Sequence, residues 1–356
     1  MLRAACLAHG SRYSKYAFRG SSRSRWRLKS TRPSTTALRA AMRRAAHQLF
    51  DEPRVFEDPL ACRILGADTE RSIRGEREAY DTPGRKRLRA FLAARSRYAE
   101  DALDLAFARG VRQYVVLGAG FDTYAYRKGA SPLRVFEVDH PATQAHKREL
   151  LAAASIPIPP SLTFAPIDFE AETLLEALCA AGFDARAPAF FSWLGVTPYL
   201  TTAAVMETLG VVARRPAGSE IVFDFAPSAD TLTAPQRLAR AALAARVASV
   251  GEPWVSFFDP CEFPRDLTAM GFGSAEVVGS EAIDRRYFRD RADGLRLGGS
   301  GYLMHALSSG LAPAYSHEGG GPDGHPNDVE PDGGPSPIGR GVDGDAGGAD
   351  DVHDLE

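Results

Sequence analysis

The chain has 356 residues, of which 44% are hydrophobic and 25% charged, enough apolar material for one large α/β domain or two ordinary ones. No apolar run approaches the roughly 20 residues that a membrane-spanning helix needs, so we expect no membrane partner. The four cysteines lie far apart without metal-ligand spacing, which indicates neither a metal site nor a disulfide framework and favours the reducing cytoplasm.

The two ends of the chain differ sharply in charge. Residues 1–50 contain 12 Lys or Arg and no acid, whereas residues 317–356 contain 11 Asp or Glu and one Arg, Arg340. We expect residues 1–33 to be a disordered basic extension and residues 316–356 a disordered acidic Gly/Pro-rich tail, because neither can bury a packed apolar face. An organelle transit peptide or a nucleic-acid-binding arm would also be basic. The Arg- and Ala-rich composition of the whole chain argues against the first, and the lack of interleaved aromatic residues argues against the second.

The region between these ends, residues 34–315, begins with helices. They are expected near residues 36–50 and 84–109, and the Asp58-Pro59 dipeptide marks a boundary between helical segments. Residues 34–110 are therefore predicted to form a helical cap that precedes the first strand.

Residues 111–315 alternate between strand and helix patterns, with an insert at about 228–265. This alternation predicts an α/β fold with a Rossmann-like, doubly wound, mostly parallel sheet and helices on both faces. The expected strands are 113–117, 135–138, 162–167, 189–194, 219–225, 275–278 and 301–307. The expected helices lie near 141–154, 171–181, 202–214, 234–250 and 262–270.

A glycine turn follows the first predicted strand. The strand leads into Gly118-Ala119-Gly120, and the next strand ends on Asp139, 21 residues after Gly118. Such a turn lets the backbone approach a ligand, and an acid at the end of the second strand can accept hydrogen bonds from both ribose hydroxyls. Dinucleotides and S-adenosyl ligands are both held in this way, and a glycine turn that merely closes a βα unit gives the same pattern.

The residues after the turn separate the two ligand classes. A nicotinamide or flavin site needs a third small residue for close helix packing, and Thr123 stands there instead. Asp122 would also repel a pyrophosphate at the start of the following helix. A sulfonium ligand that carries no phosphate meets neither obstacle.

Four motifs in order carry a resemblance: LGAGFDT, FEVDHP, the IDF of residues 167–169 and FFSWLGVTPYLT. Together they resemble the S-adenosylmethionine-dependent methyltransferases related to leucine carboxyl methyltransferase, and most of all the actinobacterial-type branch of that superfamily. The resemblance covers roughly residues 37–308. It implies a class I methyltransferase fold, S-adenosylmethionine as cofactor, and O-methylation of a carboxylate or hydroxyl on a small molecule. A non-catalytic cofactor-binding relative and a nicotinamide-dependent oxidoreductase are the alternatives.

The resemblance also implies cofactor-binding residues. Gly118 and Gly120 would lie beside the methionyl part and Asp139 at the ribose, while Asp168 would accept from the adenine amine with Phe169 beside the base. Both acids have a plainer interpretation as helix N-caps after a strand.

An arginine upstream of the sheet completes the implied set. Arg95 matches the position whose guanidinium pairs with the methionyl carboxylate, a geometry that suits a bidentate bond. Arg97 lies two residues further and would face elsewhere on the helix, so a surface pair with Asp101 is expected for it.

The catalytic residues are not identified by the sequence. Leu194 occupies a place where relatives commonly carry an acid, and Tyr199 of the same motif is a candidate to orient the acceptor, although a buried core tyrosine fits as well. A hydroxyl acceptor would need a general base, for which His140 is the nearest candidate, but His140 also fits a turn before a proline. Acceptor recognition is expected from the helical cap and from the insert, where Trp254, Phe257 and Phe258 either line a pocket or seal the core. Neither the acceptor nor the oligomeric state can be named.

Overall fold

The computed structural model describes residues 33–129, 131–167, 173–298 and 301–310. All of these residues belong to one compact unit.

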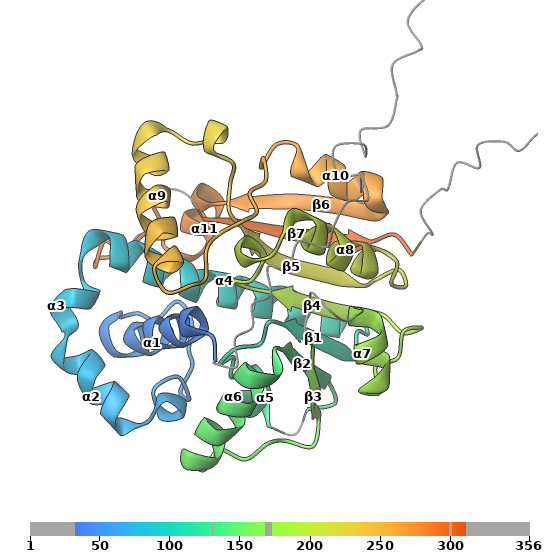
Figure 1. Ribbon diagram of the computed structural model, residues 1–356, viewed down its shortest axis with the longest axis horizontal. Helices are drawn as coiled ribbons and strands as arrows, with labels where there is room; N and C mark the ends of the chain where they lie inside the picture. Colours follow the sequence, from blue (N-terminus) through green and yellow to red (C-terminus); the bar gives the residue numbers. More distant parts are fainter. Residues whose placement is uncertain (1–32, 130, 168–172, 299–300, 311–356) are drawn as a thin grey trace, which may run out of the picture. The chain divides into compact units, whose positions relative to one another are not determined.

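A seven-stranded sheet forms the centre of this unit, in the order β3-β2-β1-β4-β5-β7-β6 (Figure 1). The five strands from β3 to β5 are parallel, whereas β7 runs antiparallel between β5 and β6. The strands are β1 (Gln113–Leu117), β2 (Arg134–Asp139), β3 (Leu162–Pro166), β4 (Ala189–Trp193), β5 (Glu220–Phe225), β6 (Phe272–Gly279) and β7 (Tyr302–Ser308). The predicted doubly wound, mostly parallel sheet is therefore confirmed.

The helices include all those expected from the sequence within the described residues, and several short ones in addition. The α-helices are α1 (Thr35–Phe50), α2 (Ala67–Gly75), α3 (Arg77–Tyr80), α4 (Pro83–Ala108), α5 (Tyr124–Lys128), α6 (Pro141–Ala153), α7 (Leu174–Ala180), α8 (Thr202–Ala213), α9 (Ala234–Ala248), α10 (Phe263–Met270) and α11 (Ser280–Tyr287). The 3₁₀ turns are η2 (Arg63–Leu65), η3 (Thr197–Tyr199) and η4 (Ala229–Thr231). The sequence did not predict α2, α3, α5 or α11, which are each nine residues or shorter.

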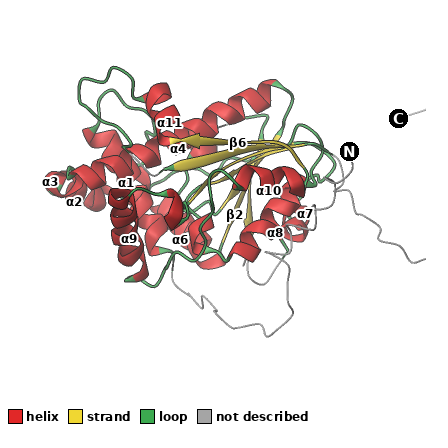
Figure 2. Cartoon of the chain, turned by 90° about the horizontal axis from the view of Figure 1, so that it is seen from above, coloured by secondary structure: helices red, strands yellow, loops and turns green. Residues whose placement is uncertain are grey.

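Both faces of the sheet are covered by helices, which explains why the central strands are continuous apolar runs. Figure 2 shows α4 and α11 on one side of the strands and α7, α8 and α10 on the other. Alternate residues of β1 enter the two layers: Tyr114 and Val116 pack with α4 and α11, and Val115 and Leu117 pack with α7, α8 and α10. Every residue of β1 is therefore buried.

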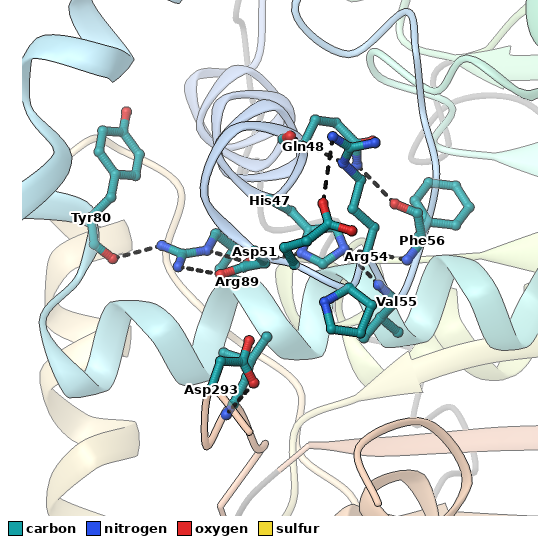
Figure 3. A network of polar contacts seen from close by, with 12 residues as sticks. His47, Gln48, Asp51, Arg54, Val55, Phe56, Tyr80, Arg89 and Asp293 are labelled. Carbon is teal, nitrogen blue, oxygen red and sulfur yellow. Dashed lines mark hydrogen bonds and ion pairs between the residues drawn. The ribbon is translucent and has the colours of Figure 1, made fainter. Parts of the chain in front are cut away.

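Within the helical cap, α1 is joined to α4 by a buried charged network (Figure 3). Arg89 donates from Nε and Nη2 to the two carboxylate oxygens of Asp51, over 2.8 and 2.7 Å, and from Nη1 to the carbonyl of Tyr80. His47 lies 2.8 Å from the same carboxylate through Nδ1, and its Nε2 accepts from the backbone N–H groups of Val55 and Phe56. The imidazole is therefore the neutral tautomer with its proton on Nδ1.

The charge of Asp51 is stabilised by these neighbours. Burial alone would raise the pKa of the carboxyl group, but the hydrogen bonds from His47 and Arg89 outweigh burial and lower the pKa to about 2. Both ends of the pair are buried, with 5% of the Asp51 side chain and 1% of the Arg89 side chain exposed. The network thus fixes the end of α1 against α4.

Candidate functional site

Two predicted site residues, Gly118 and Asp139, lie with two further residues at the carboxyl ends of four neighbouring strands. Gly118 follows β1, Asp139 ends β2, Leu194 follows β4, and Asp224 is the last residue but one of β5. Because these strands are adjacent in the order β2-β1-β4-β5 and all parallel, their ends share one edge of the sheet. Ligands of open α/β sheets bind at such an edge.

The glycine turn is built for close backbone contacts. Gly118 has a φ of +63°, and a Cβ placed on it would lie 2.2 Å from Cγ2 of Val196. Gly120 has a φ of +48°, and its ideal Cβ would lie 3.3 Å from the Cβ of Ala37. A side chain at position 118 would thus be strained and would collide with Val196, whatever ligand binds. The first turn of α1 packs directly over this loop.

Asp139 is held by two backbone donors. One oxygen accepts from the N–H of Gly120, and the other accepts from the N–H of His140 over 2.7 Å. Burial raises the pKa of Asp139, although these two N–H groups oppose the shift. A carboxylate offers about four acceptor positions, so each oxygen retains one for a ligand.

The N-cap interpretation of Asp139 is not supported, because the next residue caps the helix. His140 is the N-cap of α6, and its Nδ1 accepts from the N–H of Ala142 over 3.2 Å. This arrangement agrees with the expected turn residue before Pro141. It also engages the Nδ1 lone pair that a general base would use.

Thr123, the residue that replaces a third glycine, connects the loop to the helical cap. Its hydroxyl donates to the carboxylate of Asp58 over 2.7 Å, and Nε of Arg44 lies 2.7 Å from the same carboxylate. The Asp58 side chain is fully buried. Asp122 accepts over 2.8 Å from the N–H of Tyr124, the first residue of the short helix α5. A close helix–strand packing of the dinucleotide type is therefore replaced by a polar link.

Arg95 projects from α4 to the same edge and meets an acid that the sequence analysis did not select. Its Nη1 donates to a carboxylate oxygen of Asp224 over 2.7 Å, and the other oxygen of Asp224 accepts from the N–H of Gly195. A Cβ on Gly195 would lie 2.7 Å from Nη2 of Arg95, so the guanidinium rests against bare backbone. Arg97 instead pairs with Asp101 at 2.6 Å on the exposed side of α4, as expected.

Tyr199 lies under the first turn of α1. Burial raises the pKa of its phenol, and the side chains beside it are those of Trp254 and Thr36. A second acid, Glu252, accepts from the N–H groups of Thr35 and Thr36 over 2.8 and 3.1 Å and from the Thr36 hydroxyl. The loop after α9 is thereby tied to the start of α1.

The two other aromatic residues of this loop have different surroundings. Phe258 is buried and stacks on Phe263 with ring centroids 4.1 Å apart, so it seals the core. Phe257 is 38% exposed, with the guanidinium of Arg240 over its ring. Trp254, by contrast, adjoins Tyr199.

The chain was compared with known proteins. Residues 37–213 match the family model described as "Leucine carboxyl methyltransferase". A Bacillus subtilis (strain 168) protein, named "Putative S-adenosyl-L-methionine-dependent methyltransferase YktD", is 32% identical over 307 residues, which cover 79% of this chain and 99% of YktD. The chain belongs to the leucine carboxyl methyltransferase-like family of S-adenosylmethionine-dependent methyltransferases.

Two further proteins are similar to this chain. A Mycobacterium tuberculosis (strain ATCC 25618 / H37Rv) protein, Rv3787c, carries the same kind of name and is 34% identical over 202 residues, 54% of this chain and 64% of that protein. A crystal structure of a Thermobifida fusca YX protein described as a "putative methyltransferase" covers 80% of this chain and 99% of that chain, with a TM-score of 0.50 and 19% identity. The latter shows the likeness in fold.

The residues present fit the family's cofactor. The glycine turn exposes backbone, Asp139 retains acceptor positions, and Asp224 accepts the only hydrogen bond that Arg95 donates within the described part of the chain. The predicted adenine residues Asp168 and Phe169 lie outside the described residues. Within the described ranges, no three acidic, Cys or His residues gather as a metal site, and no helix is both long and apolar enough to cross a membrane.

Two residues of the site escaped sequence reasoning. Asp224 lies near the end of a buried strand, as Asp139 does, and that position was a usable signal. Glu252 lies in a loop between Gly251 and Pro253, and its partners are backbone N–H groups of a distant helix. No local pattern marks such a residue.

Proposed function

We propose that this chain transfers a methyl group from S-adenosylmethionine to a carboxylate or hydroxyl oxygen of a small molecule. The observation that carries the proposal is the carboxylate of Asp139, which two backbone N–H groups hold at the end of β2 with acceptor positions to spare. An acid so placed suits the two hydroxyls of a ribose.

The cofactor, when bound, supplies an electrophilic methyl group on a sulfonium sulfur. The chain's own residues then have to bind and orient it. Gly118 and Gly120 give access to the backbone beside the methionyl part, Asp139 takes the ribose hydroxyls, and Arg95 binds the methionyl carboxylate. Asp168 and Phe169 remain the predicted partners of the adenine.

The acceptor would lie under the first turn of α1. Tyr199 and Trp254 meet there, and a phenol whose pKa is raised stays protonated at neutral pH, so Tyr199 can donate a hydrogen bond to an acceptor oxygen. A carboxylate acceptor needs no general base, which agrees with the engaged Nδ1 of His140. The first turn of α1, which packs over the glycine turn, would exclude water and align the acceptor with the methyl group.

The alternative functions are distinguished by specific residues. A nicotinamide site conflicts with Thr123, whose hydroxyl is used by Asp58, and with the family assignment. A non-catalytic relative remains the second candidate because Leu194, at the place of the family acid, packs against the apolar layer under α4. That candidate predicts cofactor binding without methyl transfer.

A cytoplasmic location and a small-molecule partner belong to the same proposal. The described cysteines Cys62, Cys179 and Cys261 are all unpaired, as is usual in a reducing compartment. No nucleic-acid partner is proposed.

The test combines binding and turnover. Calorimetry with S-adenosylhomocysteine and with NADH should show binding of the first and not of the second. The enzyme is then incubated with a metabolite extract and methyl-labelled cofactor, and mass spectrometry should detect a labelled methyl ester or ether. Binding without any labelled product would support the non-catalytic relative, and binding of NADH alone would overturn the proposal.

A further inference from the structure

The Arg95–Asp224 pair has features that a purely structural ion pair does not need. It joins α4 to the carboxyl end of β5, and its side chains are 12% and 8% exposed, so both charges lie close to the surface of the site without being freely solvated. Arg95 and Asp224 meet through one nitrogen and one oxygen, Nη1 and Oδ2, rather than through a two-point fork. The Nη2 and Nε groups of Arg95 and further lone pairs of Asp224 are thus not used in this contact.

The pair has both unused hydrogen-bond acceptors, on Asp224, and unused donors, on Arg95. Asp224 accepts once at each oxygen, from Arg95 and from the N–H of Gly195, so that acceptor positions remain on both. Arg95 donates one hydrogen bond within the described residues, from Nη1, which leaves Nη2 and Nε. A cation and an anion with spare donors and acceptors stand side by side.

The pair is also placed at the ligand-binding edge. Trp193 of β4 pairs with Phe223 of β5, so Asp224 lies level with the first residue after β4. Val196, which follows Gly195, contacts the site of the missing Cβ of Gly118. Asp224 therefore lies two strands from the glycine turn, with β4 between them, and no side chain at position 195 separates the pair from the backbone that follows β4.

We propose that Asp224 is a cofactor-binding residue that forms, with Arg95, a clamp for the α-amino-acid end of S-adenosylmethionine. The guanidinium binds the carboxylate, and Asp224 accepts from the ammonium group. A lone buried arginine would leave that ammonium group without a counter-charge, whereas the pair matches both charges of the zwitterion. In the absence of ligand the two side chains neutralise each other, which keeps neither charge unpaired. This inference rests on the proposed function.

The test uses three ligands that differ only at the amino-acid end. They are S-adenosylhomocysteine, its analogue with hydrogen in place of the α-ammonium, and its analogue with hydrogen in place of the α-carboxylate. Calorimetry is done on the full chain and on Asp224→Asn, Arg95→Lys and, as a control on the same helix, Asp101→Asn. Thermal melting verifies that each variant is folded.

Asp224→Asn should weaken the binding of S-adenosylhomocysteine at least about tenfold, which is the effect of losing one charge-assisted hydrogen bond. It should leave the affinity for the deaminated analogue unchanged. Arg95→Lys should weaken the binding of S-adenosylhomocysteine and leave the affinity for the decarboxylated analogue unchanged. Lysine keeps the positive charge but cannot bind a carboxylate through two parallel N–H groups. Asp101→Asn should alter none of the three.

The proposal is overturned if Asp224→Asn weakens the binding of the deaminated analogue as much as that of S-adenosylhomocysteine, since a merely structural role would lower both affinities alike. Wild-type protein provides a test that needs no folded variant: it should bind S-adenosylhomocysteine at least about tenfold more tightly than the deaminated analogue. Equal affinities would refute the clamp alone. Failure of the wild type to bind any of the three ligands would instead refute the proposed function, and the clamp with it.

Discussion

Replacing Asp51 by asparagine tests the network that fastens the helical cap. The variant keeps the shape of the side chain but removes the charge that faces Arg89, whose side chain is 1% exposed. Breaking a buried pair in this way costs about 3–5 kcal/mol, because the remaining charge is left uncompensated. Asp81 also lies 3.1 Å from Arg89 and is only partly buried, so we expect the lower end of that range.

The pH dependence gives a second measure of the same interaction. The pKa of Asp51 falls from 3.8 to about 2 on folding, which corresponds to about 2 kcal/mol of stability at neutral pH. Because the folded pKa is the lower one, this stability is present above pH 3.8 and is lost as the pH falls toward 2. About 1 kcal/mol of the difference between wild type and Asp51→Asn should have disappeared at pH 3.

Urea unfolding of both proteins, followed by circular dichroism between pH 7 and pH 3, measures the two free energies. Asp68→Asn is the matched control, since it removes a carboxylate that pairs with Arg71 on the exposed face of α2. That change should alter the free energy of unfolding by less than about 1 kcal/mol. If Asp51→Asn behaves like the control, or if its deficit is the same at pH 7 and pH 3, the network does not stabilise the cap as described.

Three further outcomes follow from the site. Asp139→Ala should weaken S-adenosylhomocysteine at least about tenfold by calorimetry with the thermal transition intact, and unchanged affinity would remove Asp139 from the ribose. A chain shortened to residues 34–315 should keep the melting temperature and cofactor affinity of the full chain, because neither end can supply a packed apolar face; a clearly lower melting temperature would show that one end docks. Glu252→Gln should reduce stability by about 1 kcal/mol and accelerate amide exchange at Thr35 and Thr36, whose N–H groups it accepts from, whereas unaltered exchange there would mean that the contact does not hold the helix.

The parallel part of the sheet could be predicted because its strands are short apolar runs separated by helical patterns, and these runs are buried on both faces. The direction of β7 could not, since the sequence of Tyr302–Ser308 reads as a strand in either orientation and only its pairing with β5 and β6 decides. The four short helices escaped because one or two turns carry too little periodicity for a pattern to emerge.

The positions of candidate site residues could be predicted where these residues are close together in the sequence. The glycine turn and Asp139 lie within a single βαβ unit, and both are at the predicted edge. The partner of Arg95 lies 129 positions further along the chain, so no local pattern could join the two. Leu194 could not be interpreted from its own motif either, because Asp224 of the adjoining strand lies level with it and puts a carboxylate at that edge.

The contact between Glu252 and the start of α1 has a consequence for biosynthesis. Thr35 precedes its acceptor by 217 positions, and at a translation rate of roughly 5–20 residues per second the two leave the ribosome about 10–40 seconds apart. During that interval the first N–H groups of α1 lack the carboxylate that they later bind, and Ala37 has no glycine turn to cover until residue 120 has emerged. A nascent chain that stops short of residue 252 therefore contains its parallel strands but lacks the carboxylate that binds the start of α1. The first of the described helices thus waits for residue 252 before it acquires these contacts.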